Sequence, residues 1–124
     1  MMIKAVHIFT LALSLAFTAP ALAQSGQADF VPGLDDVPLM TALSQQGGYD
    51  LVFDKPEGRI VESVVTGDVQ ALSVKAFYDQ NLPQLGWKSA GQDRWLREGE
   101  VLQLQYFSTE TQTLGVRFTL KPAQ

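Results

Sequence analysis

The chain has no cysteine among its 124 residues and a single histidine, His7. Without thiols it can form no disulfide and has no cysteine for catalysis or metal binding. His7 lies in an N-terminal segment that we expect to be removed, so the mature chain would lack histidine too. These absences exclude Ser-His-Asp and Cys-His catalysis, thiol redox chemistry, and zinc or haem sites that need His or Cys. Stability must come from packing.

Basic residues are also scarce, with 9 Lys and Arg against 13 Asp and Glu and a net charge of −4. No Lys/Arg cluster is visible along the sequence. An acidic protein repels phosphate backbones and anionic lipid. We therefore expect no nucleic-acid partner, and nothing in the sequence calls for a cofactor.

Residues 1–23 have the pattern of a secretory signal peptide. Lys4 precedes an apolar run over residues 5–17, and Ala21 and Ala23 are small enough for a signal-peptidase site. The apolar run is short for a membrane span. We expect cleavage after Ala23, a periplasmic location and no stable membrane anchor; the alternative is an uncleaved anchor helix.

The remaining residues are enough for one domain with a modest core. Residues 24–48 form a Pro- and Gly-rich segment in which Pro32 and Pro38 forbid a long helix, and residues 39–45 can form one or two helical turns. We expect the α+β domain over residues 49–122.

The domain begins with a predicted hairpin. Tyr49, Leu51 and Phe53 alternate with mostly polar residues, so we expect these three side chains to face the core. Residues 55–58 have turn composition, and residues 59–66 are rich in β-branched side chains, as in a partner strand.

A helix follows, with Asp68 or Ser73 as its expected N-cap. Pro83 disfavours helical geometry at Leu82, and Gly86 is placed to close the last turn. Helical spacing predicts a buried stripe of Leu72, Phe77, Leu82 and Leu85, widened by Val74 and Tyr78.

Phe77 and Trp87 lie where this helix and the next strand must share a core, and burial of each ring stabilises the fold by about 2–3 kcal/mol. We interpret these rings as core rather than as a ligand-stacking site. Tyr78 is the exception, because its hydroxyl can reach the surface beside the helix.

Four more strands are predicted, over residues 87–90, 94–98, 101–108 and 114–121. The last two alternate apolar with polar side chains, so one face of the sheet is buried and the other is wet. The predicted fold is α+β, an antiparallel sheet in β-β-α-β-β-β-β order with one main helix packed on one face.

Carboxylates are the remaining candidates for catalysis. Glu62 with Asp79, or Glu98 with Glu100, would serve a glycan hydrolase only if the two carboxyl groups faced each other across a cleft. A domain with one sheet and one helix has little room for such a cleft. We therefore expect a protein that is not an enzyme.

A few charged residues on the predicted strands have no evident role in folding. A sheet face that combines them with Ile60, Val64, Leu96 or Phe107 has the composition of a protein-docking surface. The alternative is an ordinary polar sheet face. The candidate docking residues are Arg59, Glu62, Arg94 and Arg97, with Tyr78.

The chain resembles a group of small exported bacterial proteins of unknown function. The resemblance lies in Phe77-Tyr78, Leu82-Pro83 and Leu85-Gly86-Trp87, followed by Arg97-Glu98-Gly99-Glu100, and it extends to the "FDKPEGRIVE" hairpin before the helix. It implies a compact helix-on-sheet domain in the cell envelope and no catalytic residues. The chain differs from related envelope lipoprotein domains in lacking a lipid-bearing cysteine.

The function that we expect is a non-enzymatic binding domain of the periplasm whose partner is an envelope protein. A second hypothesis is a carrier that holds a small apolar ligand between helix and sheet, and a third is a carboxylate-based glycan hydrolase. A cavity in the core would favour the carrier. An exposed apolar patch on a fully packed domain would favour docking.

Overall fold

A computed structural model describes residues 29–45 and 50–123 of the chain. The fold is α+β, as predicted: mostly antiparallel sheet with one helix. In chain order the elements are β1 (Phe30–Val31), β2 (Leu34–Pro38), β3 (Asp50–Lys55), β4 (Gly58–Gly67), α1 (Ala71–Asn81), the 3₁₀ turn η1 (Pro83–Leu85), β5 (Lys88–Ser89), β6 (Arg94–Arg97), β7 (Glu100–Ser108) and β8 (Leu114–Pro122).

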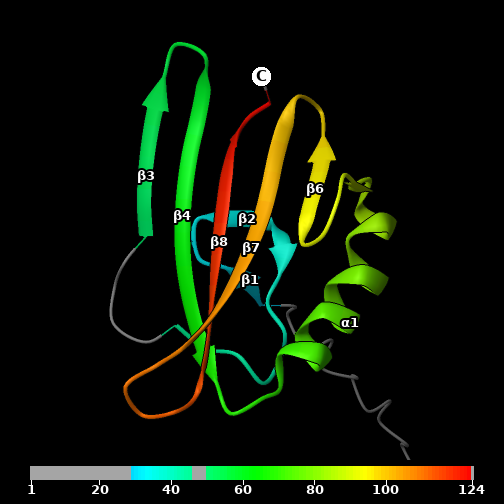
Figure 1. Ribbon diagram of the computed structural model, residues 1–124. Helices are drawn as coiled ribbons and strands as arrows, with labels where there is room; N and C mark the ends of the chain where they lie inside the picture. Colours follow the sequence, from blue (N-terminus) through cyan, green and yellow to red (C-terminus); the bar gives the residue numbers. More distant parts are fainter. Residues whose placement is uncertain (1–28, 46–49, 124) are drawn as a thin grey trace, which may run out of the picture.

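Six strands form the main sheet, in the spatial order β3-β4-β8-β7-β6-β5 with every neighbouring pair antiparallel (Figure 1). The expected succession of two strands, a helix and four strands agrees in part with this order. The difference lies before it, where β1 and β2 pair with each other in a separate two-stranded sheet.

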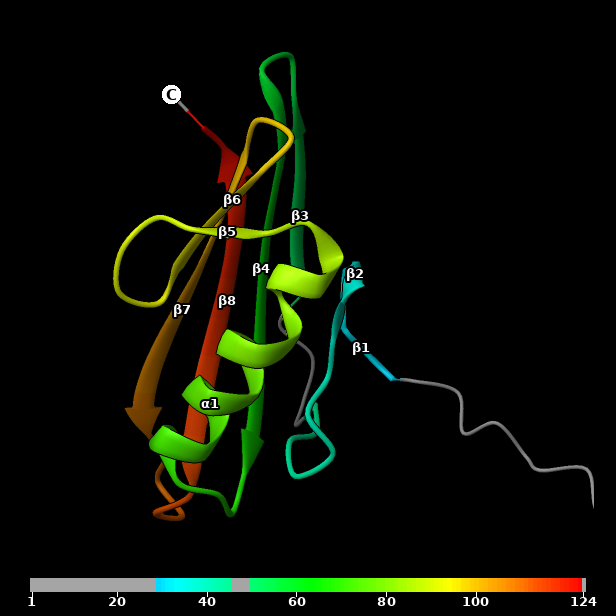
Figure 2. The ribbon, with the colours of Figure 1, turned by 90° about the vertical axis from the view of Figure 1, so that its right-hand side faces the viewer.

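Helix α1 and the β1–β2 hairpin lie on the same side of the main sheet (Figure 2). We call this side the inner face. Tyr78 of α1 packs edge-on against Phe118 of β8, with ring centroids 5.3 Å apart, and Gly33 of the hairpin lies close against Val61 of β4. No element of residues 29–45 or 50–123 covers the opposite side, the outer face (Figures 1 and 2).

The alternation predicted for the last two strands is confirmed. In the middle of both strands, the aliphatic and Phe side chains that point to the inner face are nearly inaccessible to solvent, and the side chains between them are mostly half-buried or exposed. The inner-face residues of β7 and β8 that are buried are Leu102, Leu104, Val116, Phe118 and Leu120. Trp87 is buried as predicted, and Phe77 is partly buried against the same core.

The helix is rotated relative to the predicted stripe. Val74, Tyr78 and Leu82 are buried, whereas Leu72 is 76% exposed and Leu85 is 44% exposed. The prediction was therefore right for Leu82 and wrong for Leu72 and Leu85. Residues spaced by four share one side of a helix, and this row includes Tyr78, whose hydroxyl is satisfied inside the fold.

Both helix ends differ from the expectation in detail. Gln70 is the N-cap residue and makes no side-chain capping hydrogen bond, so the Asp68 and Ser73 caps were wrong. Leu82 keeps helical geometry in spite of Pro83, because Pro83 starts a 3₁₀ turn instead of ending the helical path. Gly86 closes this turn with φ = 89°, as predicted, in the left-handed region that a side chain disfavours.

The described part of the N-terminal segment differs from the expectation in its secondary structure. The expected helical turns over residues 39–45 do not form; the chain makes a turn there, and Ser44 pairs with Thr66 at the end of β4. The described part of this segment belongs to the same core as the sheet, since Val31, Leu34 and Val37 are fully buried. The domain boundary that we expected at residue 49 lies outside the described residues.

The core assignments on β3 are not supported. Phe53 is 50% exposed and pairs with Ile60, so it points to the outer face. The prediction for Tyr49 and for the side chain of Leu51 falls outside what the structure describes.

Candidate functional site

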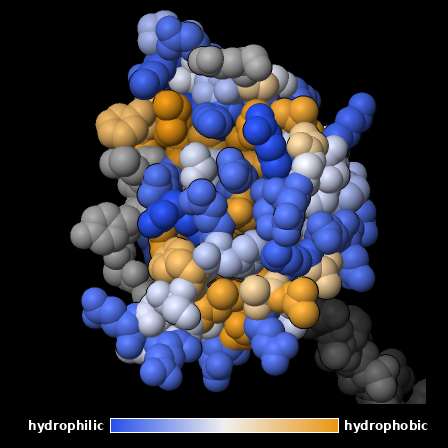
Figure 3. All heavy atoms as spheres, in the orientation of Figure 1, coloured by the Kyte–Doolittle hydropathy of each residue, from blue (hydrophilic) through white to orange (hydrophobic). Residues whose placement is uncertain are grey.

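The strand register determines which side chains share the outer face. Directly opposed residues of antiparallel strands point to the same side of a sheet. One row across the sheet contains Phe53, Ile60, Val101, Leu96 and Lys88, with Lys121 paired to Val101. The next row pairs Glu62 with Thr119, Thr119 with Gln103, and Gln103 with Arg94. Figure 3 views this face, with hydrophilic residues across its middle and hydrophobic residues above and below them.

Positive charge gathers on this face. Five cations of the strands point outward against one carboxylate, that of Glu62. The five are Lys55, Lys88, Arg94, Arg117 and Lys121. The expectation that the chain has no basic cluster was therefore wrong in three dimensions, because the register assembles residues that lie far apart in the sequence.

A short network of charged and aromatic groups lies on the outer face. Arg117 Nε is 3.2 Å from Glu62 Oε1, and the Arg117 guanidinium carbon is 5.4 Å from the centroid of the Phe107 ring. The Phe107 ring lies over Gly115, where a Cβ would come within 2.4 Å of ring carbons. The missing side chain therefore allows the ring to lie close to the sheet.

The predicted docking residues separate onto two faces. Glu62 and Arg94 point outward, but Arg59 and Arg97 have the register parity of the inner face. Arg59 forms an ion pair with Glu100, with Nε 3.2 Å from Oε2. The structure thus brings two of the four charged candidates to one surface and leaves the other two out of it.

Arg97 connects the N-terminal hairpin to the segment that follows the helix. Its guanidinium pairs with the Asp36 carboxylate of β2, donates from Nη1 to the Leu85 carbonyl at 3.2 Å, and lies 4.4 Å from the centroid of a ring of Trp87. Only 17% of its side chain is exposed. These contacts fasten the N-terminal hairpin to the end of the helix and leave little of Arg97 for a partner.

Tyr78 is not a surface residue, so that part of the docking prediction was wrong. It is 1% exposed, and its hydroxyl donates a 2.9 Å hydrogen bond to the Pro38 carbonyl of β2. Burial raises the pKa of Tyr78 above its ordinary value. Burial, reinforced by the nearby Asp93 carboxylate, also raises the pKa of Tyr106.

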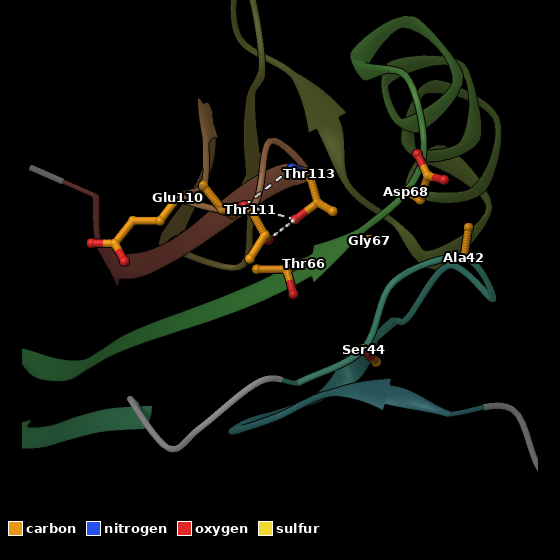
Figure 4. A pocket seen from close by; sticks show the side chains of 9 residues that line it. Ala42, Ser44, Thr66, Gly67, Asp68, Glu110, Thr111 and Thr113 are labelled. Carbon is orange, nitrogen blue, oxygen red and sulfur yellow. Dashed lines mark hydrogen bonds between the residues drawn. The ribbon is translucent and has the colours of Figure 1, made fainter.

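A polar hollow of about 540 Å³ lies at the opposite end of the sheet from the β3–β4 turn (Figure 4). Its lining includes Ser44, Thr66 and Asp68, together with threonines of the β7–β8 loop. Thr109 Oγ1 is 2.7 Å from Thr113 Oγ1 and 3.1 Å from Thr111 Oγ1. These three threonine hydroxyl groups satisfy one another, and the carboxylates of Asp68 and Glu110 also line the hollow.

The structure bears on the two carboxylate pairs that were considered for catalysis. Glu62 is on the outer face and Asp79 is on α1, on the other side of the sheet. Glu100 is occupied by Arg59, whereas Glu98 sits at an exposed turn. Within residues 29–45 and 50–123, no group of three or more His, Cys, Asp or Glu is placed to hold a metal ion.

The sequence contained a signal for the basic face that our strand predictions did not use. Arg117 and Lys121 alternate with the buried residues Val116, Phe118 and Leu120. Arg94 likewise precedes the buried Trp95. The alternation within each strand would have predicted that these three cations point to the same face. Lys55 and Lys88 lie at strand ends, so their direction could be known only from the pairing of the strands.

Comparison with protein-family models, with curated proteins and with solved structures gives no match. In the part of the chain that the structure describes, no helix is long and apolar enough to cross a membrane.

Proposed function

We propose that the chain is an exported, non-enzymatic interaction domain of the periplasm that docks an envelope protein on the outer face of its sheet. One observation carries the proposal. No element of the described residues covers this face over its six strands, yet it contains half-exposed apolar side chains such as Phe53 and Phe107 beside oriented polar ones. Such a mixture is what protein interfaces bury.

The packing of the inner face favours docking over the apolar carrier. Val74 and Tyr78 of α1 are fully buried, and the Tyr78 ring contacts Phe118 of the sheet directly. The larger hollows lie on the surface and have mixed polar linings; the one beside Arg97 has about 740 Å³. The described helix and sheet therefore provide no enclosed apolar chamber between them.

Export is part of the proposal and rests on the pattern of residues 1–23. Mass spectrometry of the protein recovered from the periplasmic fraction measures this directly. The expected mass is that of a chain beginning at Gln24. Retention of the leader, or recovery only from the cytoplasm, would contradict the proposed location.

Docking is tested by photo-crosslinking in the producing cell. A photoreactive amino acid replaces Gln105, which is exposed on the outer face, or Gln80, which is exposed on α1 and serves as the matched control. We expect a discrete crosslinked product from position 105 and none from position 80. Equal products from both positions, or none from position 105, would refute docking on the outer face.

A further inference from the structure

We infer that the outer face is a basic docking surface for an acidic stretch of polypeptide. This inference rests on the proposed function and names the chemistry of its partner. The charge of the outer face differs in sign from that of the whole molecule. The chain has a net charge of −4, yet the strands direct five cations and one carboxylate to the outer face.

The cations of the outer face are available to a partner. Lys55, Lys88, Arg94 and Lys121 are exposed, and the ion pairs of the described residues do not include them. Arg117 is the exception, because Glu62 already neutralises it. Complementary charge on a partner would therefore meet four cations without first breaking an internal salt bridge.

The apolar side chains that lie beside the cations favour a polypeptide as the binding partner. Lys121 and Lys88 share their row with Ile60, Val101 and Leu96, so the row contains both apolar and charged groups. Acidic and aliphatic side chains of a protein segment would fit both kinds of group. Gln103 and Thr119 supply neutral hydrogen-bonding groups in the next row.

A nucleic acid fits this face less well. Sheet surfaces that bind single strands stack successive bases on neighbouring aromatic rings. The two phenylalanines of this face lie on β3 and β7 and six residues apart along the strands, which places them on the order of 20 Å from each other. Successive bases cannot use both rings.

A lipid surface also fits less well. Membrane-bound faces insert protruding apolar side chains below the headgroups. Here Val101 is only 2% exposed, and Ile60 and Val64 are half-buried. The apolar side chains that are exposed, Phe53, Leu96 and Phe107, lie on three different strands. The cations would contact anionic headgroups, but no single apolar cluster would enter the bilayer with them.

The experiment selects displayed random peptides on the immobilised full chain and measures the best binders by fluorescence anisotropy. We expect enrichment of Asp and Glu beside aliphatic residues, and weaker binding as salt rises. Arg94→Gln combined with Lys121→Gln should weaken binding roughly fivefold to tenfold, since each exposed ion pair contributes modestly. The control Lys75→Gln removes a cation on α1 whose Nζ lies 3.5 Å from Asp93 Oδ2, on the inner side of the sheet, and should leave the affinity unchanged.

The outcomes separate the two proposals. Peptides without acidic bias that compete with crosslinking at position 105 would overturn the charge inference and leave docking intact. Selection of peptides that ignore the outer face, with no crosslink at position 105, would overturn both. Phosphatidylglycerol vesicles and a single-stranded oligonucleotide are the further probes. Tighter binding of either one, lost in the Arg94→Gln/Lys121→Gln variant, would show an anion-binding face whose partner is not a polypeptide.

Discussion

The same strands form both faces of the sheet, but Arg59 and Arg97 of the inner face both have carboxylate partners, whereas of the five outward cations only Arg117 belongs to an ion pair of the described residues. On the inner face, Arg97 is held by a carboxylate, a carbonyl and an indole ring. On the outer face, Arg94 and Lys121 are exposed. A cation with charge-assisted hydrogen bonds in a mostly buried position stabilises the fold, whereas a solvent-exposed cation contributes little to stability. The difference indicates that the charged residues of the inner face contribute more to the stability of the domain than those of the outer face.

The largest difference in stability between the two faces is expected from the substitution of two phenylalanines. Phe118→Ala removes a fully buried ring from the inner face and should lower the free energy of unfolding by about 3–5 kcal/mol. Phe107→Ala, on the outer face at 36% exposure, should cost less than half as much. Urea unfolding followed by tryptophan fluorescence measures both. Equal losses would show that the two faces contribute equally to stability.

The next test compares two arginines. Arg97→Ala removes charge-assisted contacts in a mostly buried setting and should cost about 1–3 kcal/mol. Arg94→Ala on the exposed face should stay within about 0.5 kcal/mol of the wild type. The same unfolding measurement applies. A larger loss for Arg94 than for Arg97 would contradict the division of roles.

Unfolding at alkaline pH tests the hydrogen bond between Tyr78 of the helix and the Pro38 carbonyl of the hairpin. Because burial raises the folded-state pKa of Tyr78 above its ordinary value of 10.0, the unfolded chain ionises first as pH rises. Stability should therefore be constant below about pH 10 and fall above it, by up to about 1.4 kcal/mol per pH unit for this group. Tyr106 adds a slope of the same sign.

Tyr78→Phe should lower stability by about 1 kcal/mol at neutral pH, because the Pro38 carbonyl loses its donor. It should also make the alkaline decline shallower. Unfolding curves between neutral pH and about pH 11 measure both effects. An unchanged slope in the variant would show that Tyr78 ionises as easily in the folded protein as in the unfolded chain.

The smallest effect is expected from the ion pair on the outer face. Both side chains are more than 40% exposed, so Glu62→Gln should change the free energy of unfolding by less than about 0.5 kcal/mol. Thermal unfolding at low and high salt measures it. A loss above about 1 kcal/mol would mean that the outer face, too, is held together by its charges.

Local patterns predicted the parts of the fold that depend on local geometry. The alternation around Phe118 identified a half-buried strand, and Gly86 identified the end of the helical path. The rotation of α1 could not be seen in this way, because it depends on Tyr78 finding an acceptor at Pro38, 40 positions earlier in the chain. The N-terminal hairpin was missed for the same reason, since its buried residues are stabilised by contacts with remote strands.

The candidate site was predictable only in part. Glu62 and Arg94 were chosen as strand residues without a folding role, and the register places them on the outer face. Arg97 was chosen on the same argument but has a structural partner in Asp36, which lies in a segment with no predicted strand. The positive face was missed because net charge averages over the whole molecule, whereas a partner meets one side of it.

The separation of charge across the sheet has a further consequence. Cations on the outer face, and carboxylates outside the ion pairs of the described residues, such as Asp35 on the hairpin and Asp79 on the helix, give the described domain an electric dipole moment directed through the sheet. A molecule of this kind turns in the field of an anionic body before the two surfaces touch, so more of their collisions begin in a productive orientation. The arrangement would therefore speed up encounter more than it would prolong the complex.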